Sequence, residues 1–358
     1  MSIEPVINNS AHTSNLTVDK TNRNILVDSF GRRVDYVRIS VTDRCDFRCI
    51  YCMAEDMTFM PRKDVLSLEE LTLLSRAFTQ LGVKKIRITG GEPLIRKGLT
   101  QLLHNVAELS GLEQLCITTN GSQLVDMASE LKRAGVHRLN ISLDTLDATR
   151  FTQLTRNGKL NQVLAGIDAA LAAGFEKIKL NAVLMKNYNL HEATALTEFA
   201  LEKNMDISFI EEMPLGEIHS HARDAEFISS ADVRKQLSEK FTLEESNVST
   251  GGPSRYWSAK GYTGKVGFIS PHSSNFCSSC NRVRVTATGR LLLCLGNEHS
   301  VDLRAVMRDH NFLTQTIDEQ VHQLKTTIQN AMTIKPEKHE FDLSAETQIL
   351  RFMNTTGG

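Results

Sequence analysis

Several features that mark common classes of protein are missing from this chain of 358 residues. It has one tryptophan and a formal net charge of −1, so we expect neither an aromatic groove for single-stranded nucleic acid nor a general attraction to nucleic acid or membranes. No apolar run approaches the ~18 residues that a membrane-spanning helix needs, and no secretory leader opens the chain. We therefore expect a cytoplasmic protein with no membrane or nucleic-acid partner.

Two motifs that often identify a catalytic site are also missing. There is no G-x-x-x-x-G-K-[ST] sequence, so phosphate groups are not held by a P-loop. The eleven histidines show no H-E-x-x-H spacing. The odd total of seven cysteines, most of them in tight groups, argues against a disulfide framework. We expect free thiols in a reducing compartment, where thiolates are available to bind metal.

The grouping of the cysteines is the strongest indication of chemistry. Six of them form two triplets: Cys45, Cys49 and Cys52 in a C-x3-C-x2-C run, and Cys277, Cys280 and Cys294 in a C-x2-C-x13-C run. Each iron of a [4Fe–4S] cluster normally needs a cysteine, so a triplet leaves one iron open to another ligand. Zinc is the alternative, completed by histidine or water at the first triplet and by His272 at the second. The lone Cys116 is expected in the core.

Strand-like and helix-like segments alternate through the middle of the chain. Strands are predicted at residues 36–41, 84–89, 113–118, 137–143, 176–183 and 206–211. Helices are predicted from a capping box at Ser67 and Glu70, and at about 98–109, 122–134, 160–173 and 190–204. This alternation implies parallel βαβ units. Because eight strands close a TIM barrel, six predict an α/β fold with an incomplete (β/α)6 TIM-type barrel.

The chain is predicted to have three parts. Residues 1–27 are rich in Ser, Thr and Asn and are expected to form a flexible tail. Residues 28–244 are expected to form the partial barrel. From residue 245, glycine breaks and β-branched residues predict short antiparallel strands, with a hairpin at 287–290. Residues 245–358 are therefore expected to form a C-terminal extension of antiparallel strands and helices.

Polar or glycine-rich sequences follow all six predicted strands. They are the first cysteine triplet, Thr89–Pro93, Thr118–Gly121, Ser142–Asp144, Asn181 and Met213–Pro214. Turn residues are ordinary in any single loop. Six such sequences together, one with a metal-binding triplet, predict a catalytic face at the carboxyl ends of the barrel strands.

The first triplet, with Tyr51 before its last cysteine and GGEP downstream, resembles the radical S-adenosylmethionine superfamily. The second triplet, in FCSSCNRVRVTATGRLLLCL, is similar to the GTP 3′,8-cyclase family of molybdenum-cofactor biosynthesis. The resemblance runs through IRITGGEPLIR, TTNG, LNISLDTLD, IKLNAV, EEMPLG, GFISP and the final two glycines, over about residues 28–358. Ala54 and Glu212 depart from the family pattern. Neither departure removes a proposed ligand, but Glu212 implies different packing near the cofactor.

The resemblance implies two [4Fe–4S] clusters and S-adenosylmethionine as cofactors. The first cluster would be held by Cys45, Cys49 and Cys52, and the second by Cys277, Cys280 and Cys294, with its open iron on the guanine base. Contacts to S-adenosylmethionine are implied for Tyr51, Gly91, Ser142 and Met213. Contacts to GTP are implied for Arg38, Arg87, Thr118, Lys179, Arg282 and Arg284. The family's C-terminal tail, here Gly357 and Gly358, reaches into the active site and is needed for activity.

The implied reaction converts GTP to (8S)-3′,8-cyclo-7,8-dihydroguanosine 5′-triphosphate, with a 5′-deoxyadenosyl radical removing the C3′ hydrogen. Expected partners are GTP, a reductant such as flavodoxin or ferredoxin, the downstream cyclic pyranopterin monophosphate synthase, and a second copy in a homodimer. Guanidinium groups suit the phosphates. Two alternatives stay open: a radical enzyme that acts on a peptide, and a non-catalytic two-cluster electron-transfer protein.

Overall fold

The computed structural model describes residues 25–218, 220–343 and 349–357. The six predicted strands are present as β1 (Tyr36–Ser40), β2 (Lys85–Thr89), β3 (Gln114–Thr119), β4 (Arg138–Ser142), β5 (Ile178–Leu184) and β6 (Asp206–Glu211). Helices follow as α1 (Leu68–Gln80), α2 (Leu99–Ala107), α3 (Leu124–Arg133), α4 (Ala148–Thr155), α5 (Leu160–Ala172) and α6 (Ala193–Glu202). Ser67 and Glu70 form the predicted capping box at α1.

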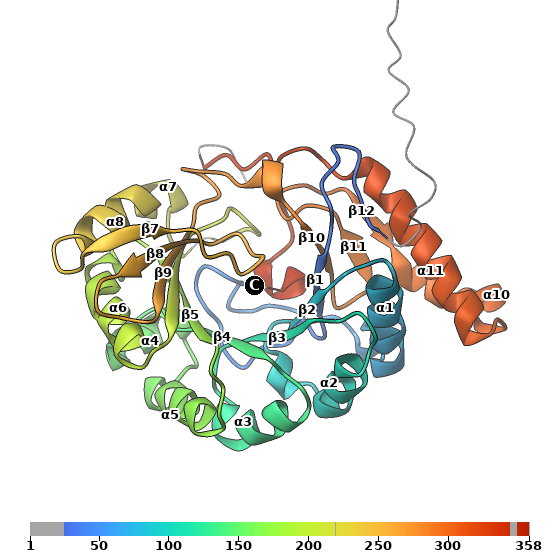
Figure 1. Cartoon of the computed structure of the whole chain (residues 1–358), viewed down its shortest axis with the longest axis horizontal. Coiled ribbons are helices and arrows are strands. Elements are labelled where there is room, and N and C mark those ends of the chain that lie inside the picture. The colour runs from blue at the N-terminus through green and yellow to red at the C-terminus, as the bar shows by residue number, and fades with distance from the viewer. Residues whose placement is uncertain (1–24, 219, 344–348, 358) are drawn as a thin grey trace, which may run out of the picture.

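The barrel strands pair in parallel, in chain order, and the helices cover their outer face (Figure 1). Two further parallel strands come from the C-terminal extension. β9 (Lys265–Ile269) pairs with β6, and β10 (Arg282–Val285) pairs with β1. The prediction of antiparallel strands here is confirmed only in part, because β9 and β10 each have one parallel and one antiparallel neighbour.

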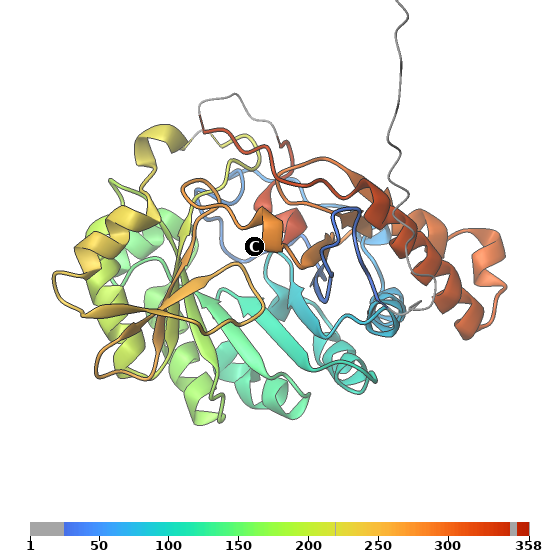
Figure 2. The same ribbon diagram turned by 45° about the horizontal axis from the view of Figure 1, so that its top comes forward.

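The remaining strands of the described chain extend the two edges of the sheet. On one side β8 (Arg255–Ala259) and β7 (Leu243–Ser246) add to β9, and on the other β11 (Arg290–Leu292) and β12 (Ser300–Asp302) add to β10. The turn between β10 and β11 contains Gly289 at φ +82°, as expected for the predicted hairpin. The resulting sheet order is β12-β11-β10-β1-β2-β3-β4-β5-β6-β9-β8-β7. The ring of parallel strands is curved but open (Figures 1 and 2).

The chain crosses the open side of the barrel between β9 and β10, because these consecutive strands lie at opposite edges. Residues 270–281 make this crossing and include Cys277 and Cys280. The buried carboxylate of Glu211, at the end of β6, fixes the start of the crossing. It accepts hydrogen bonds from the backbone N–H groups of His272 (3.0 Å) and Ser273 (3.1 Å). The fold thereby places Cys277 and Cys280, two members of the second cysteine triplet, over the barrel mouth.

Along each barrel strand the side chains point alternately outward, toward the helices, and inward, toward the barrel interior. Outward-facing residues such as Val37, Ile86 and Leu139 are buried in the main hydrophobic core. TIM barrel interiors are usually filled by branched apolar side chains. Here the inward positions of the barrel strands instead carry polar groups such as Arg87 on β2 and Lys179 on β5, which line a cavity. A charged barrel interior costs stability unless a ligand or counter-charge compensates it, so this interior indicates a binding site.

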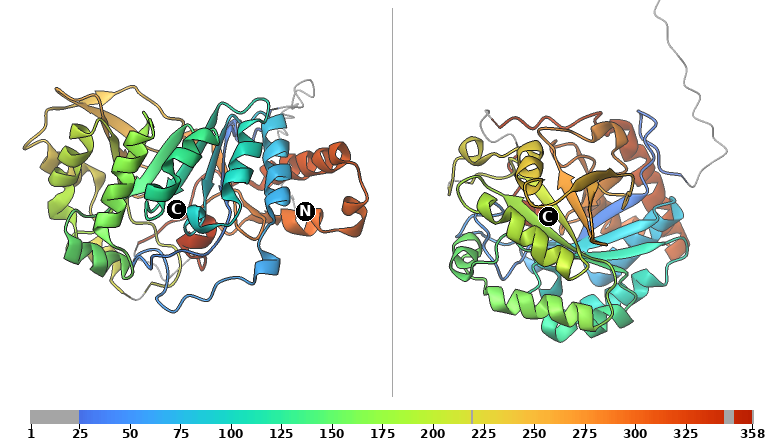
Figure 3. Two further views of the ribbon diagram at one scale, coloured as in Figure 1. Left: turned by 90° about the horizontal axis from the view of Figure 1, so that it is seen from below. Right: turned by 60° about the vertical axis from the view of Figure 1, so that its left-hand side comes forward.

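The C-terminal region returns to the barrel after a long excursion. Helices α7 (Arg223–Glu226) and α8 (Ser230–Leu237) follow β6, and α9 (Leu303–Met307), α10 (His310–Leu313) and α11 (Ile317–Ala331) follow β12. α11 packs against α1 at the outside of the molecule, whereas α12 (Met353–Thr356) lies inside the ring of strands (Figures 1 and 3). No helix among the described residues is long and apolar enough to cross a membrane.

Candidate functional site

Two cavities lie inside the barrel, and each contains one cysteine triplet. The first cavity is at the carboxyl ends of β1 to β6. Among the predicted site residues, it is lined by Cys45, Cys49, Tyr51, Cys52, Gly91, Thr118, Ser142 and Met213. The structure therefore brings together the first triplet and all four residues implied in cofactor contact.

Gly90 and Gly91 pack against the backbone that leads into the first triplet. A Cβ on Gly90 would lie 2.6 Å from the carbonyl oxygen of Thr42, and a Cβ on Gly91 would collide with the backbone of Arg44. The Gly91 N–H donates to the Thr42 carbonyl (2.8 Å), and the Glu92 N–H donates to the Arg44 carbonyl (2.8 Å). Glycine is needed here for this close approach of two backbone segments, whatever the cavity binds.

The aromatic residue of the first triplet is held by a buried carboxylate. Tyr51 Oη donates to Asp144 Oδ2 (2.7 Å), and Asp144 Oδ1 accepts from the Val183 N–H (2.8 Å). Burial raises the pKa of Asp144 to about 6, while these hydrogen bonds favour its charged form. The contact ties the cysteine loop to the ends of β4 and β5.

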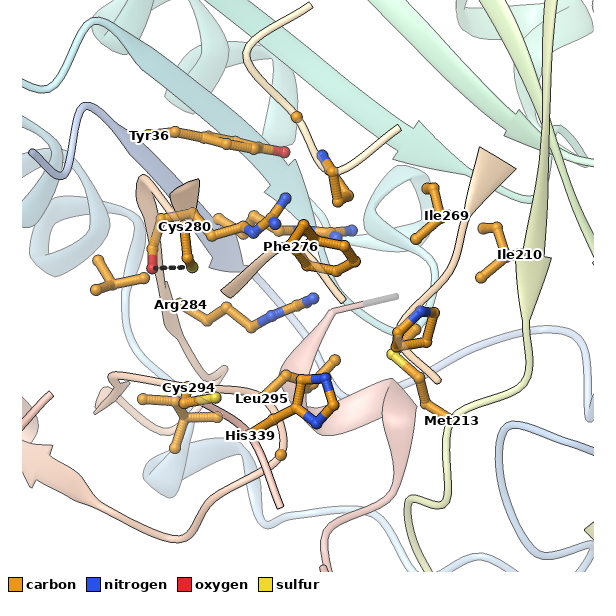
Figure 4. Close-up of a pocket in the computed structure, with 18 of the residues that line it drawn as sticks. Tyr36, Ile210, Met213, Ile269, Phe276, Cys280, Arg284, Cys294, Leu295 and His339 are labelled. Carbon is orange, nitrogen blue, oxygen red and sulfur yellow. Dashed lines mark hydrogen bonds between the residues drawn. The ribbon is translucent and has the colours of Figure 1, made fainter. Parts of the chain in front are cut away.

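The second cavity lies under the segment that crosses the barrel mouth (Figure 4). Among the predicted site residues, it is lined by Arg38, Arg87, Lys179, Met213, Cys277, Cys280, Arg282, Arg284 and Cys294. Figure 4 shows the guanidinium group of Arg284 projecting toward the centre of the cavity, between the two loops that carry Cys280 and Cys294. Of the predicted GTP contacts, only Thr118 lies outside this lining, and its hydroxyl accepts a hydrogen bond from Arg87 (3.1 Å).

The second cavity is strongly cationic. None of the described residues that line it is Asp or Glu. Burial and the charges of Arg38 and Arg282 lower the pKa of Arg284 well below its ordinary value. Burial and the charges of Arg87 and Arg138 do the same to Lys179. The lowered pKa values reflect repulsion between neighbouring cations and the loss of their hydration on burial. The negative charge of a polyanionic ligand would compensate both.

The two cavities adjoin. Asn181, Ile210, Met213 and Met353 line both of them. A molecule in the first cavity and a molecule in the second are therefore separated by side chains only. This arrangement suits a reaction between two molecules held next to each other.

The thiol groups suit iron–sulfur clusters better than zinc. All seven cysteines are free, Cys116 is buried in the core as predicted, and the other six line the cavities. Among the described residues, no three His, Cys, Asp or Glu side chains come together around a single metal ion, as a zinc site requires. His272, the candidate fourth zinc ligand, does not line the second cavity, and its Nε2 lies 2.8 Å from the Glu212 carbonyl oxygen. Three soft thiol donors at each cavity fit a cluster with one open iron.

Buried polar atoms without partners concentrate around the cavities. Among the described residues, such atoms include Arg38 Nε, Asn140 Oδ1, Asn181 Oδ1, His339 Nε2 and Asn354 Oδ1, and all five residues line a cavity. Native proteins rarely leave buried polar groups unpaired. Their grouping here is the pattern expected of a site that a ligand completes.

The C-terminal tail reaches the boundary between the cavities, as the resemblance implies. Arg284 donates hydrogen bonds to the carbonyl oxygens of Thr356 (3.3 Å) and Gly357. Gly357 has φ +75°, and a Cβ there would overlap the hydroxyl of Thr89. Gly358 lies outside the described residues.

Several residues of the site were not predicted. Asn140 and Tyr36 face the second cavity. Each lies two residues from a predicted site residue of the same strand, Ser142 and Arg38 respectively, and residues two apart in a strand face the same side. This spacing could have predicted both of them. His339 and Asn354 carry no such signal, since His339 lies in an irregular segment and Asn354 in the short helix α12, both far along the chain. Glu212, which departs from the family pattern, forms a buried ion pair with Arg223 (3.0 Å).

Comparison with known proteins agrees with both halves of the site. Residues 39–200 match the model of the radical SAM superfamily, and residues 205–341 match Molybdenum Cofactor Synthesis C. A protein of Saccharophagus degradans named GTP 3′,8-cyclase is 66% identical over 333 residues, which cover 93% of this chain and 98% of the relative. One of Pseudomonas fluorescens with the same name is 57% identical over 93% of this chain and 99% of the relative.

Similarity to solved structures concerns the fold alone. Streptococcus suis SuiB bound to S-adenosylmethionine superposes with a TM-score of 0.54 at 17% identity, over 88% of this chain and 77% of that one. SuiB bound to the precursor peptide SuiA gives a TM-score of 0.55 at 20% identity, over 81% of this chain and 66% of that one. These likenesses support the partial barrel.

Metal analysis tests the assignment of the triplets. Anaerobically reconstituted protein should contain iron and sulfide for two [4Fe–4S] clusters and no stoichiometric zinc. Replacing Cys277, Cys280 and Cys294 by alanine should leave about half of the iron, because the first triplet is unaffected. Cys116→Ala, the control, should keep all of it. Stoichiometric zinc, or loss of all iron from the triple variant, would contradict the assignment.

The cations of the second cavity should also lower the pKa that a titration measures for Tyr36. Burial opposes ionisation of this phenol, but Arg87, Arg38 and Lys85 outweigh burial and lower its pKa to about 8. The unfolded phenol keeps its proton to a higher pH, so this group makes the folded state more stable as the pH rises above 8. Ultraviolet titration of cluster-free protein should show a phenolate step near pH 8. Tyr36→Phe should remove it and Tyr262→Phe should not; a step that persists in Tyr36→Phe refutes the assignment.

Proposed function

The chain belongs to the GTP 3′,8-cyclase family of radical S-adenosylmethionine enzymes, and from this premise we propose that its two cavities bind S-adenosylmethionine and GTP. The enzyme converts GTP to (8S)-3′,8-cyclo-7,8-dihydroguanosine 5′-triphosphate in molybdenum-cofactor biosynthesis. The observation that carries the proposal is the contiguity of a cysteine-lined cavity with a cationic one inside a single barrel.

The first cavity supplies the cofactor site. Cys45, Cys49 and Cys52 would hold one [4Fe–4S] cluster, and the glycine loop after β2, packed beside the cysteine loop, lines the same cavity. When bound, the cluster and S-adenosylmethionine supply the radical chemistry that joins C3′ to C8 of GTP. Tyr51, held by Asp144, keeps the cysteine loop on the strand ends.

The second cavity supplies the substrate site. Cys277, Cys280 and Cys294 would hold the second cluster, whose open iron suits a nitrogen or oxygen of guanine. Arg38, Arg87, Lys179 and Arg284 give the triphosphate a buried cationic environment, and guanidinium forks match phosphate oxygens. The guanidinium of Arg282 lies 4.9 Å from the centre of the Phe276 ring, which fixes both groups at the cavity wall.

Further partners belong to the same proposal. A flavodoxin or ferredoxin is the expected reductant, and the cyclic pyranopterin monophosphate synthase is the expected consumer of the product. A homodimer and a cytoplasmic location remain predictions.

The proposal is tested by anaerobic incubation of reconstituted protein with S-adenosylmethionine and a chemical reductant. The enzyme should release 5′-deoxyadenosine at a rate that GTP raises strongly, with formation of the cyclised nucleotide. A peptide-modifying enzyme would not respond to GTP, and a plain electron carrier would release no 5′-deoxyadenosine. Either result would reject the proposal.

Deleting Gly357 and Gly358 should suppress turnover while iron content and GTP affinity stay within about twofold of wild type. The reason is that the carbonyl groups of Thr356 and Gly357 orient Arg284 in the cavity, so the deletion would misplace one cation. The other cations of the cavity, Arg38, Arg87, Lys179 and Arg282, would still bind GTP. Thr355→Ser, which keeps the hydroxyl that bonds Phe352 O, serves as control. Wild-type product formation by the deletion variant would refute a role for the tail end.

A further inference from the structure

The C-terminal tail contacts Arg284, one of the cations proposed to bind the substrate. It also contacts the first cluster loop, which is the segment after β1 that carries Cys45, Cys49 and Cys52. α12 lies inside the ring of strands (Figure 1), and its first residue, Met353, lines both cavities. The Met353 N–H donates to the carbonyl oxygen of Cys52 (3.3 Å). The next residue, Asn354, lines the first cavity only. The tail therefore forms part of the wall of the cofactor cavity.

Asn354 is fixed on the first cluster loop by a hydrogen bond of its side chain, next to the Met353 N–H that donates to Cys52. The side-chain Nδ2 of Asn354 donates to the carbonyl oxygen of Asp43 (2.9 Å). The residue is only 1% exposed, so the amide cannot exchange this partner for bulk water.

This contact decides which way the amide points. A backbone carbonyl only accepts hydrogen bonds, so the group that faces Asp43 O has to be the –NH2 of Asn354. The oxygen is therefore on the other side of the amide. Oδ1 of Asn354 is buried and has no partner among the described residues. A buried acceptor left unpaired destabilises the protein, and a ligand that donates a hydrogen bond to it removes this penalty.

We propose that Asn354 is a cofactor-binding residue, whose side-chain oxygen accepts a hydrogen bond from an N–H or O–H group of S-adenosylmethionine. The tail then has two functions: Gly357 acts at the substrate cation and Asn354 completes the cofactor cavity. This inference rests on the proposed function, because it takes S-adenosylmethionine as the occupant of the first cavity.

The test measures binding rather than turnover. The dissociation constant of S-adenosylmethionine is determined by equilibrium dialysis on reconstituted protein without reductant, so that no cofactor is cleaved. Asn354→Leu, nearly isosteric but unable to accept, should raise this constant about tenfold. Its iron content and its GTP affinity should match wild type. Thr355→Val, the neighbouring tail residue that lines neither cavity, should bind S-adenosylmethionine as wild type does.

Asn354→Asp separates accepting from merely packing. It keeps an acceptor oxygen but loses the donor to Asp43 O, so it should bind S-adenosylmethionine more tightly than Asn354→Leu does. If Asn354→Leu loses iron, the S-adenosylmethionine dissociation constant of Asn354→Asp is compared with that of Thr355→Val instead. Binding by Asn354→Asp that is tenfold weaker than binding by Thr355→Val then counts against the inference. Binding by Asn354→Leu within twofold of wild type overturns it, as does equal weakening in both Asn354 variants. Wild-type protein that binds no S-adenosylmethionine would instead reject the proposed function.

Discussion

The incomplete closure of the parallel sheet is the constraint on which the rest of the molecule depends. Six strands leave two edges and an open side, and hydrogen-bonding groups at sheet edges need partners. The C-terminal extension satisfies both edges, with β9 on β6 and β10 on β1. Because β9 and β10 are consecutive, the chain has to cross the barrel mouth, and the crossing carries Cys277 and Cys280. The same topology that completes the sheet thus places Cys277 and Cys280 at the mouth of the barrel that contains the first cysteine triplet.

The charge inside the barrel explains why the site is built for a polyanion. Arg38, Arg87, Lys179 and Arg284 face a cavity whose described lining has no carboxylate. Without a ligand this arrangement is unfavourable, as the lowered pKa of Arg284 and Lys179 indicates. In the proposed function, binding of GTP would convert this cost into affinity, because the phosphates would replace the missing counter-charge. The whole chain has a formal net charge of −1, so the excess of cations at this cavity is a local feature.

The sequence predicts the local features well and the long-range ones less well. The six barrel strands and the capping box at Ser67 are set by short-range patterns, and the structure has them. The pairing of β9 and β10 with opposite edges was not predicted, because strand partners distant in sequence leave no local signal. Likewise, nothing in the sequence near Asn354 indicates that this residue lies beside Cys52. The cysteine triplets were found because metal-ligand spacing is local, whereas Asn140 and His339 join the site only through the fold.

The central claim is that the cofactor and the substrate react directly across the boundary formed by Asn181, Ile210, Met213 and Met353. It is tested most directly with GTP that carries deuterium at C3′, incubated anaerobically with S-adenosylmethionine and reductant. If the two cavities are occupied as described, the 5′-deoxyadenosine that is released contains the deuterium. If the deuterium stays in the nucleotide or exchanges into water while 5′-deoxyadenosine forms without it, the two cavities do not hold the reacting pair.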